Sequence, residues 1–316
     1  MEITDEQRAL LELCAIRVGQ DSVDWSLLAR QTLDPAGLDA LREGMITEKS
    51  AAAAKSRPVL RTGLKRGPEL TGRVNAEMEA ADRAGARLVT VLDPDYPANL
   101  RLIPNLPPFL FYRGDLSEGD ARSVAVVGTR TASTTGIQRA AKMSRLLSDQ
   151  DVTVVSGLAR GIDTAAHRAA LKAGGRTISV LGTGITRCYP AENADLAEAI
   201  IASGALVSQF WPTSPPSRYT FPRRNVVMSG MSQGTVVIEA SSTSGAKMQA
   251  RLALEHGKKV FLIHSLVASQ PWARGYVDSR GAIEVADVEE VIARLAEPER
   301  VRRAIEQQQQ LALVYL

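Results

Sequence analysis

Residues 123–168 read SVAVVGTRTASTTGIQRAAKMSRLLSDQDVTVVSGLARGIDTAAHR. Two short apolar runs, 124–127 and 152–155, each end in a glycine-containing turn, and a helical pattern follows each turn. This order of elements is the βαβ unit of a parallel sheet. Ligands of such sheets bind at the carboxyl ends of the strands, where the free N–H groups of helix N-termini favour anions. Because Arg130 and Arg160 accompany the glycines of the two turns, we expect an anion site there.

The first turn departs from the dinucleotide-binding pattern. In G-x-G-x-x-G the second glycine lets the backbone approach a pyrophosphate, and here Arg130 occupies that place after Gly128. An arginine fills the space and offers a fork of donors suited to phosphate. The phosphate-loop pattern G-x-x-x-x-G-K-[ST] is absent from the sequence. These features favour a phosphodiester or a terminal phosphate over NAD or ATP, and no cofactor is predicted.

The composition is typical of a globular protein. The 316 residues are 45% hydrophobic and 23% charged, enough for one large or two ordinary domains. The net charge is only +3, so a nucleic-acid partner must be argued from where the arginines lie. Cys14 and Cys188 are the only cysteines, and the histidines are few and scattered, which gives no disulfide framework and no metal pattern. Without a leader pattern or a transmembrane run, we expect a cytoplasmic protein with no membrane contact.

The N-terminal part, residues 1–72, is predicted to be a small helical domain with a basic connector. Thr4 is a candidate N-cap of the first helix, and further helices are expected to begin near Asp24 and Asp34. The stretch 51–72 is rich in alanine, lysine and arginine. We interpret it as a solvated connecting segment and keep contact with nucleic acid as the less favoured alternative.

The fold class predicted for the rest is α/β. Residues 73–296 form a Rossmann-like domain, a doubly wound and mostly parallel sheet, because strands recur after helical crossovers. Two strands before the βαβ unit are expected to extend the sheet, and residues 297–316 are expected to form a helical tail with an apolar tip. The predicted strands are 87–92, 107–114, 124–127, 152–155, 177–181, 205–208, 235–238 and 259–263.

Several residues invite a catalytic interpretation, but none is assigned one. Asp163 and His167 share a helix face at a spacing of four, which suits an acid–base pair, although a turn cap and a hydrogen bond to a loop are favoured. Ser156 follows a strand but lacks the G-x-S-x-G elbow. Glu239 is either a glycosidase-like carboxylate or the cap of a helix beginning at Ser244, and a single carboxylate gives no mechanism. These residues alone therefore define no catalytic mechanism.

Aromatic residues lie among a second group of arginines. Tyr219 and Phe221 stand between Arg218 and Arg223. Aromatic rings between cations stack unpaired bases and so hold single strands without reading their sequence. The simpler interpretation of Phe221 is a core residue.

Six motifs follow one another in a fixed order, and together they resemble the DNA-processing protein A (DprA/Smf) family. They are VGTR (127–130), SGLARGIDxxAHR (156–168), LGTG (181–184), YPxEN (189–193), FPRRN (221–225) and EA followed by SGA (239–246). The resemblance covers about residues 85–265. It implies a Rossmann-like fold that binds single-stranded DNA in recombination or natural transformation. It also implies that the protein protects the strand, helps to load a RecA-type recombinase and forms a homodimer. Because the family has no established catalytic activity, the resemblance further implies that the protein is not an enzyme.

The resemblance also implies a set of DNA-binding residues. The two glycine turns would form a phosphate pocket, and further polar residues would line or support the path of the strand. The pocket residues are Gly128, Thr129, Arg130, Ser156, Gly157, Arg160 and Gly161, and the path residues are Arg168, Arg223, Arg224 and Asn225. To this set we add Lys247, which the resemblance does not supply, as a predicted phosphate contact.

The chain also departs from the family pattern. Val226 stands where members usually have an arginine, and Lys247 and Gln249 replace apolar residues. The asparagine-led turn after the last strand is not recognisable in 267–282, and no winged-helix domain is expected to follow. These differences indicate a divergent branch.

Two other hypotheses remain open at this point. Gly234, Thr235 and Glu239 partly resemble the signature of LOG-family nucleotide glycosidases, which would make the protein a nucleotide-binding sensor or a nucleotide N-glycosidase. Alternatively, the Rossmann-like domain serves only to dimerise and to present the N-terminal helices, in which case no ligand binds at the glycine turns.

Overall fold

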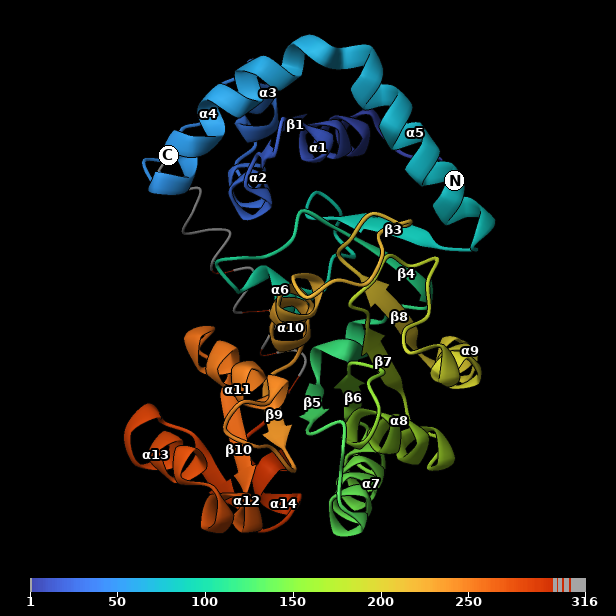
Figure 1. The fold of residues 1–316 in the computed structure, drawn as a ribbon, viewed down its shortest axis with the longest axis vertical. Helices are drawn as coiled ribbons and strands as arrows, with labels where there is room; N and C mark the ends of the chain where they lie inside the picture. The colour runs from blue at the N-terminus through green and yellow to red at the C-terminus, as the bar shows by residue number, and fades with distance from the viewer. Residues whose placement is uncertain (1, 298–299, 301–302, 304–306, 308–316) are drawn as a thin grey trace.

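The computed structural model describes residues 2–297 together with residues 300, 303 and 307. In this part of the chain one sheet has the strand order β11-β10-β9-β5-β6-β7-β8-β4-β3 (Figure 1). The strands are β3 (Arg87–Thr90), β4 (Phe109–Gly114), β5 (Ser123–Val127), β6 (Thr153–Ser156), β7 (Thr177–Val180), β8 (Ala205–Ser208), β9 (Gly234–Val237), β10 (Lys259–Ile263) and β11 (Ile283–Val285). Strands β5 to β11 pair in parallel, and β4 and β3 add an antiparallel edge. The predicted fold class is confirmed.

The central parallel strands are buried along their whole length because helices cover both faces of the sheet. Every residue of β5, β6, β7, β8 and β9 is buried, as expected for a doubly wound sheet. Figure 1 shows α7, α8 and α9 on one side of the sheet and α10 and α11 on the other. Their bounds are α7 (Thr134–Ser148), α8 (Ile162–Lys172), α9 (Ala194–Ser203), α10 (Thr220–Met231) and α11 (Gly245–Glu255).

Shorter helices complete the domain, and the sequence analysis did not predict them. They are α6 (Ala98–Arg101), η2 (Glu118–Ala121), η3 (Ala191–Asn193), α12 (His264–Ser269), α13 (Pro271–Arg280) and α14 (Glu289–Ile292). The stretch 267–282, in which no family motif is recognisable, therefore folds mainly as α12 and α13. The FPRRN motif lies in α10, a helix that was also not predicted.

The N-terminal part is helical, as predicted, and arches over the end of the sheet that carries β3 (Figure 1). It contains α1 (Asp5–Ala15), β1 (Arg17–Val18), β2 (Asp21–Ser22), α2 (Trp25–Gln31), α3 (Gly37–Arg42), α4 (Ala51–Gly63), η1 (Leu64–Arg66) and α5 (Gly67–Arg83). Thr4 caps α1, because its hydroxyl accepts a hydrogen bond from the Gln7 backbone N–H at 3.2 Å. Asp24 caps α2 in the same way through Leu27.

The interpretation of 51–72 as a solvated connecting segment is wrong, because one side of the helices in this segment is buried. Helix α4, the turn η1 and helix α5 follow one another directly, and Val59, Leu60 and Leu70 are buried in the core. An alanine-rich segment with apolar residues at helical spacing forms amphipathic helices that pack. The proposed boundary after residue 72 lies inside α5, and the division into domains stays a prediction. Apart from residues 297, 300, 303 and 307, the predicted tail 297–316 lies outside the described residues.

An aromatic cluster joins the N-terminal helices to the sheet. The Trp25 ring lies 5.0 Å from the Phe109 ring and 6.1 Å from the Trp211 ring, centroid to centroid. Phe109 belongs to β4 and Trp211 follows β8, so the N-terminal helices share the hydrophobic core of the sheet. Their removal would expose large apolar surfaces.

Candidate nucleic-acid interface

A pocket of about 410 Å³ lies where β5 and its neighbours end, between the two glycine turns, α10 and the start of α11. This is the position that the topology of a doubly wound sheet predicts for a ligand. Its lining residues are Val127, Gly128, Thr129, Arg130, Thr131, Ala159, Asp163, Phe221, Pro222, Arg224, Asn225, Met228, Ser241, Ser244, Gly245, Ala246, Met248 and Gln249. We call it the arginine pocket.

The first glycine turn is fixed so that Arg130 projects from it. A Cβ on Gly128 would lie 2.4 Å from Ile162, so only glycine fits between β5 and α8. The Thr129 backbone N–H donates to the carbonyl of Glu239 at 2.7 Å, which holds the turn against the end of β9. Arg130 itself is exposed, with its guanidinium carbon 5.4 Å from the centroid of the Phe221 ring. It forms no ion pair with any residue that the structure describes.

The second glycine turn packs against the first. Gly161 has φ +75°, and a Cβ there would lie 2.4 Å from the carbonyl oxygen of Thr129, so glycine is required. Asp163 is buried at the start of α8, and its carboxylate accepts a hydrogen bond from the Ala159 N–H at 3.4 Å. This is the turn-capping role that the sequence analysis favoured. Burial raises the pKa of Asp163, and the charge of Arg224 opposes that shift.

Arg224 supports the second turn from the interior. It is only 7% exposed, and its guanidinium donates to the carbonyls of Gly157 at 2.5 Å and Val180 at 3.0 Å. A Cβ on Gly157 would lie 2.0 Å from the nearer guanidinium nitrogen, so the glycine makes room for the arginine. Asn225, also buried, accepts from the Arg224 Nε at 3.2 Å. Arg224 and Asn225 therefore shape the pocket from the interior, and the Arg224 guanidinium is hydrogen-bonded to the protein backbone.

Two further predicted residues lie outside the pocket lining. Arg160 is exposed but pairs with the Glu192 carboxylate through two hydrogen bonds, one of 2.7 Å from Nε. This pair raises the pKa of Arg160 and lowers that of Glu192. Arg168 lies on the exposed side of α8.

Arg223 and Lys247 also lie outside the pocket lining, and both face aromatic rings. The Arg223 guanidinium carbon lies 5.6 Å from the centroid of the Trp25 ring, next to the N-terminal helices. The Lys247 ammonium lies 5.7 Å from the centroid of the Trp272 ring of α13. The structure therefore does not bring these two cations to the glycine turns.

The candidate acid–base and nucleophilic residues are structural. His167 is fully buried, its Nδ1 lies 2.7 Å from the Thr177 hydroxyl, and burial lowers its pKa to about 3. Its partner is thus a residue of β7, not the loop that was expected. Ser156 is buried and donates to the Val126 carbonyl at 2.7 Å. Neither side chain lines the pocket.

Glu239 caps a helix other than the one expected. Its carboxylate accepts hydrogen bonds from the Ser133 backbone N–H, at 3.2 Å, and from the Ser133 hydroxyl, at 2.9 Å, at the N-terminus of α7. Helix α11 is capped instead by Ser244, whose hydroxyl accepts from the Lys247 N–H at 3.2 Å. The carboxylate occupies the positive end of α7, where it is electrostatically favourable.

Phe221, which lines the arginine pocket, has further aromatic side chains near it in space or in sequence. The Phe221 and Tyr189 rings lie 5.6 Å apart, and the Arg218 guanidinium carbon lies 4.7 Å from the Tyr219 centroid. Tyr219 is 66% exposed. Sequence reasoning had singled out Tyr219 and Phe221 but missed Tyr189, although it stands in the YPxEN motif.

The described residues hold neither a candidate metal site nor a membrane-spanning helix. No group of three or more histidine, cysteine, aspartate and glutamate side chains there is arranged to hold a metal ion. No helix among these residues is long and apolar enough to cross a bilayer.

The fold and the pocket define a Rossmann-like α/β protein with an arginine-containing pocket at the carboxyl ends of its strands. The family model described as DNA recombination-mediator protein A matches residues 87–296. Protein Smf of Synechocystis sp. is 41% identical over 188 residues, which cover 58% of this chain and 47% of the relative. DNA processing protein DprA of Streptococcus pneumoniae is 40% identical over 174 residues, covering 55% and 61%. The chain belongs to the DNA recombination-mediator protein A family, and the resemblance found in its sequence is confirmed.

Solved structures agree with this assignment. The X-ray structure of DprA from Streptococcus pneumoniae superposes with a TM-score of 0.74 at 28% identity, covering 94% of this chain and 100% of that one. A Helicobacter pylori DNA processing protein A superposes with a TM-score of 0.59 at 22% identity, covering 66% and 94%, and supports the fold. In the sequence alignments the chain spans about half the length of the Smf relatives from Synechocystis sp. and Escherichia coli.

Proposed function

We propose that this protein binds single-stranded DNA, with a backbone phosphate held at the mouth of the arginine pocket. The observation that carries the proposal is Arg130, a cation without an ion-pair partner among the described residues, placed over the Phe221 ring at the carboxyl end of β5. A guanidinium binds phosphate through two parallel hydrogen bonds. Its position above an aromatic ring brings the phosphate and the base of one nucleotide within reach of one site.

The aromatic residues favour single strands over duplex. Phe221, Tyr189 and Tyr219 offer faces on which unpaired bases can stack, and Arg218 adds a cation beside them. Bases stacked in a duplex are not accessible to such faces. The printed title of the Helicobacter pylori structure describes a single-stranded DNA binding mode of that protein, which is consistent with the proposal.

The wider role that we propose is DNA processing in recombination or natural transformation, in the cytoplasm. It rests on membership of the family and on relatives named DNA processing protein DprA. In this proposal the protein protects single strands, assists loading of a RecA-type recombinase, acts as a homodimer and catalyses no reaction.

The test is fluorescence anisotropy with labelled oligo-dT and a matching duplex at two salt concentrations. We expect tight, salt-sensitive binding of the single strand and weak binding of the duplex. Arg130→Ala should lower the affinity for oligo-dT by about tenfold and flatten the salt dependence by about 0.7 unit, the value for one lost phosphate contact on a single strand. Arg83→Ala is the matched control, because Arg83 is exposed on α5, away from the pocket.

Two outcomes would contradict the proposal. One is an affinity for oligo-dT that Arg130→Ala leaves unchanged, and the other is the absence of binding at low salt. In the second case nucleotides become the ligands to test. A thermal shift with a nucleoside monophosphate would support the sensor hypothesis, and release of free base would support the glycosidase hypothesis.

A further inference from the structure

A second pocket of about 410 Å³ adjoins the arginine pocket. Its lining residues are Thr129, Thr131, Ser133, Arg139, Ile238, Glu239, Ala240, Ser241, Ser265, Leu266, Ser269 and Gln270. Thr129, Thr131 and Ser241 line both pockets, so the two are adjoining halves of one trough. This second half, which we call the hydroxyl pocket, lies over the ends of β9 and β10 and beside α12.

The hydroxyl pocket holds a cation that the fold does not use. Arg139 is exposed on α7, and its side chain makes no ion pair or hydrogen bond with the residues that the structure describes. By contrast, Arg145 on the same helix pairs with Asp149 at 2.8 Å. A surface guanidinium at the rim of a pocket, without a carboxylate partner, is available to an anion from solution.

The remaining lining is suited to a polar ligand that does not stack. The side chains of Ser241, Ser265 and Gln270 have no hydrogen-bond partner within the described part of the chain, and no aromatic residue lines the pocket. The Glu239 carboxylate already occupies the N-terminus of α7. A phosphate would therefore be repelled from that helix end and bind at Arg139, while base or sugar donors could face the hydroxyl, amide and carboxylate oxygens.

The arginine of the second glycine turn offers less free charge than Arg139. Arg160 is neutralised by Glu192. Phe221 packs against Gly182, which follows β7. From β7 to β10 the sheet has the strand order β7-β6-β5-β9-β10. At a strand spacing of about 4.8 Å this edge is about 19 Å long, which leaves room for several consecutive nucleotides.

We infer that the hydroxyl pocket is a second nucleotide subsite and that Arg139 is its phosphate contact. In this inference the bound DNA runs along the carboxyl edge of the sheet. It passes from the aromatic residues at β7, over Arg130 at β5, to Arg139 and Ser265 beside β10. The inference rests on the proposed function and adds to it a direction across the sheet and a further contact. Sequence reasoning missed Arg139, although it lies in the helix that follows the first glycine turn.

The experiment uses the full chain, oligo-dT of increasing length and two variants. Arg139→Ala should weaken the binding of long oligo-dT by about fivefold and reduce the salt slope by about 0.7 unit, with no effect on the shortest oligonucleotide that still binds. Ser265→Trp, which fills the hydroxyl pocket, should abolish the same gain of affinity with length. Arg145→Ala is the matched control, since it removes one positive charge from the same helix outside the pocket.

The outcomes separate this inference from the proposed function. If Arg130→Ala weakens binding but Arg139→Ala and Ser265→Trp bind every length like the wild type, the strand does not enter the hydroxyl pocket and the inference is overturned. An equal loss in Arg139→Ala and Arg145→Ala reports only general charge and also overturns it. If the wild-type chain does not bind oligo-dT, the proposed function itself fails. Circular dichroism of each variant identifies any loss caused by misfolding.

Discussion

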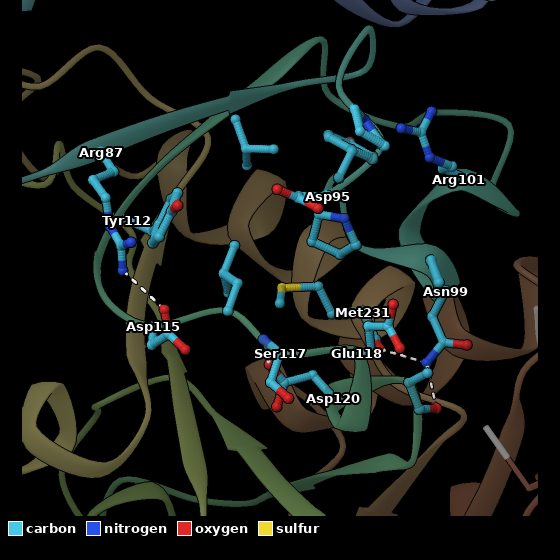
Figure 2. A pocket seen from close by; sticks show the side chains of 17 residues that line it. Arg87, Asp95, Asn99, Arg101, Tyr112, Asp115, Ser117, Glu118, Asp120 and Met231 are labelled. Carbon is cyan, nitrogen blue, oxygen red and sulfur yellow. Dashed lines mark hydrogen bonds and ion pairs between the residues drawn. The ribbon is translucent and has the colours of Figure 1, made fainter. Parts of the chain in front are cut away.

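Two ends of the same sheet carry pockets of similar size and different chemistry. The larger, about 490 Å³, lies beside β3 and β4 and near the start of β5 (Figure 2). Figure 2 shows Arg87 turned toward Asp115, to which it is paired at 3.1 Å, with the Tyr112 ring beside it. Arg101, also in the lining, donates to the backbone carbonyl of Val91 at 2.8 Å.

The difference lies in how each pocket uses its cations. In the larger pocket the arginines bond carboxylate or carbonyl oxygens of the protein, and carboxylates such as Asp95 also face the space. In the trough at the carboxyl ends of the strands, Arg130 and Arg139 have no such partner among the described residues. By volume alone, the larger pocket would be the candidate ligand site. By unpaired positive charge, the trough is the better candidate for a phosphate, because a phosphate is bound by cations.

The largest expected effect concerns the buried cation beneath the arginine pocket. Arg224→Ala should lower the free energy of unfolding by about 3–5 kcal/mol, because it leaves Asp163 without its counter-charge and two carbonyls without donors. Urea denaturation measures this, with Arg83→Ala expected within about 0.5 kcal/mol of the wild type. A loss below about 1 kcal/mol would show that Arg224 is not a structural cation, and the contrast between buried and exposed arginines would break down.

Acid unfolding should reveal the effect of the buried, uncharged His167 on stability. The pKa of His167 is about 3 in the folded protein and 6.5 in its ordinary state, so the unfolded chain binds the extra proton first as the pH falls. Stability present above pH 6.5 is therefore lost toward pH 3, by up to about 4 kcal/mol. Asp163 acts in the opposite sense because burial raises its pKa, so the informative quantity is the difference between wild type and His167→Gln. Parallel curves for the two proteins between pH 6.5 and 4 would contradict the expectation.

Filling each pocket in turn tests the comparison directly. Ser241→Trp places an indole in the trough and should weaken the binding of oligo-dT by about tenfold, a loss of about 1.4 kcal/mol. Ala98→Trp places the same group in the larger pocket and should leave the affinity within about twofold. Anisotropy titrations at one salt concentration measure both. The reverse result would place the DNA at the pocket of Figure 2.

The smallest effect is expected at the ion pair of the larger pocket. Arg87→Ala removes an exposed partner of Asp115, and such pairs contribute about 0.2–1 kcal/mol to stability. The affinity for oligo-dT should not change. A drop in affinity as large as that of Arg130→Ala would show that binding depends on overall charge, and the distinction between paired and unpaired arginines would fail.

The sequence was sufficient to place eight strands along the chain and the two glycine turns, because apolar runs ending in glycine are local signals. The order of the strands across the sheet and the strand β11 were not predicted. The sequence also placed Arg130 correctly at the end of β5. The burial of Arg224 could not be foreseen, since it depends on a missing side chain at Gly157, 67 positions earlier. Likewise, the pairing of Arg160 with Glu192 joins the second glycine turn to η3, 32 positions further on, so sequence alone gave Arg130 and Arg160 the same pocket role.

Arg139 shows the complementary limit. Its residue type and its helix were known from the sequence, but its value as a phosphate contact depends on its having no ion-pair partner among the described residues, and only the fold shows which charges are paired. The same holds for Glu239, which reaches Ser133 across the sheet edge instead of the helix that follows it.

The contact between Gly157 and Arg224 also constrains how this chain can evolve. Any side chain at position 157 would occupy the space of the guanidinium, so an ancestor that kept the arginine could not have lost the glycine first. Conversely, once a small residue replaces Arg224, a larger residue can replace Gly157. The two positions are therefore expected to mutate as a pair among descendants of this protein, and a lineage carrying only one of the changes should be rare.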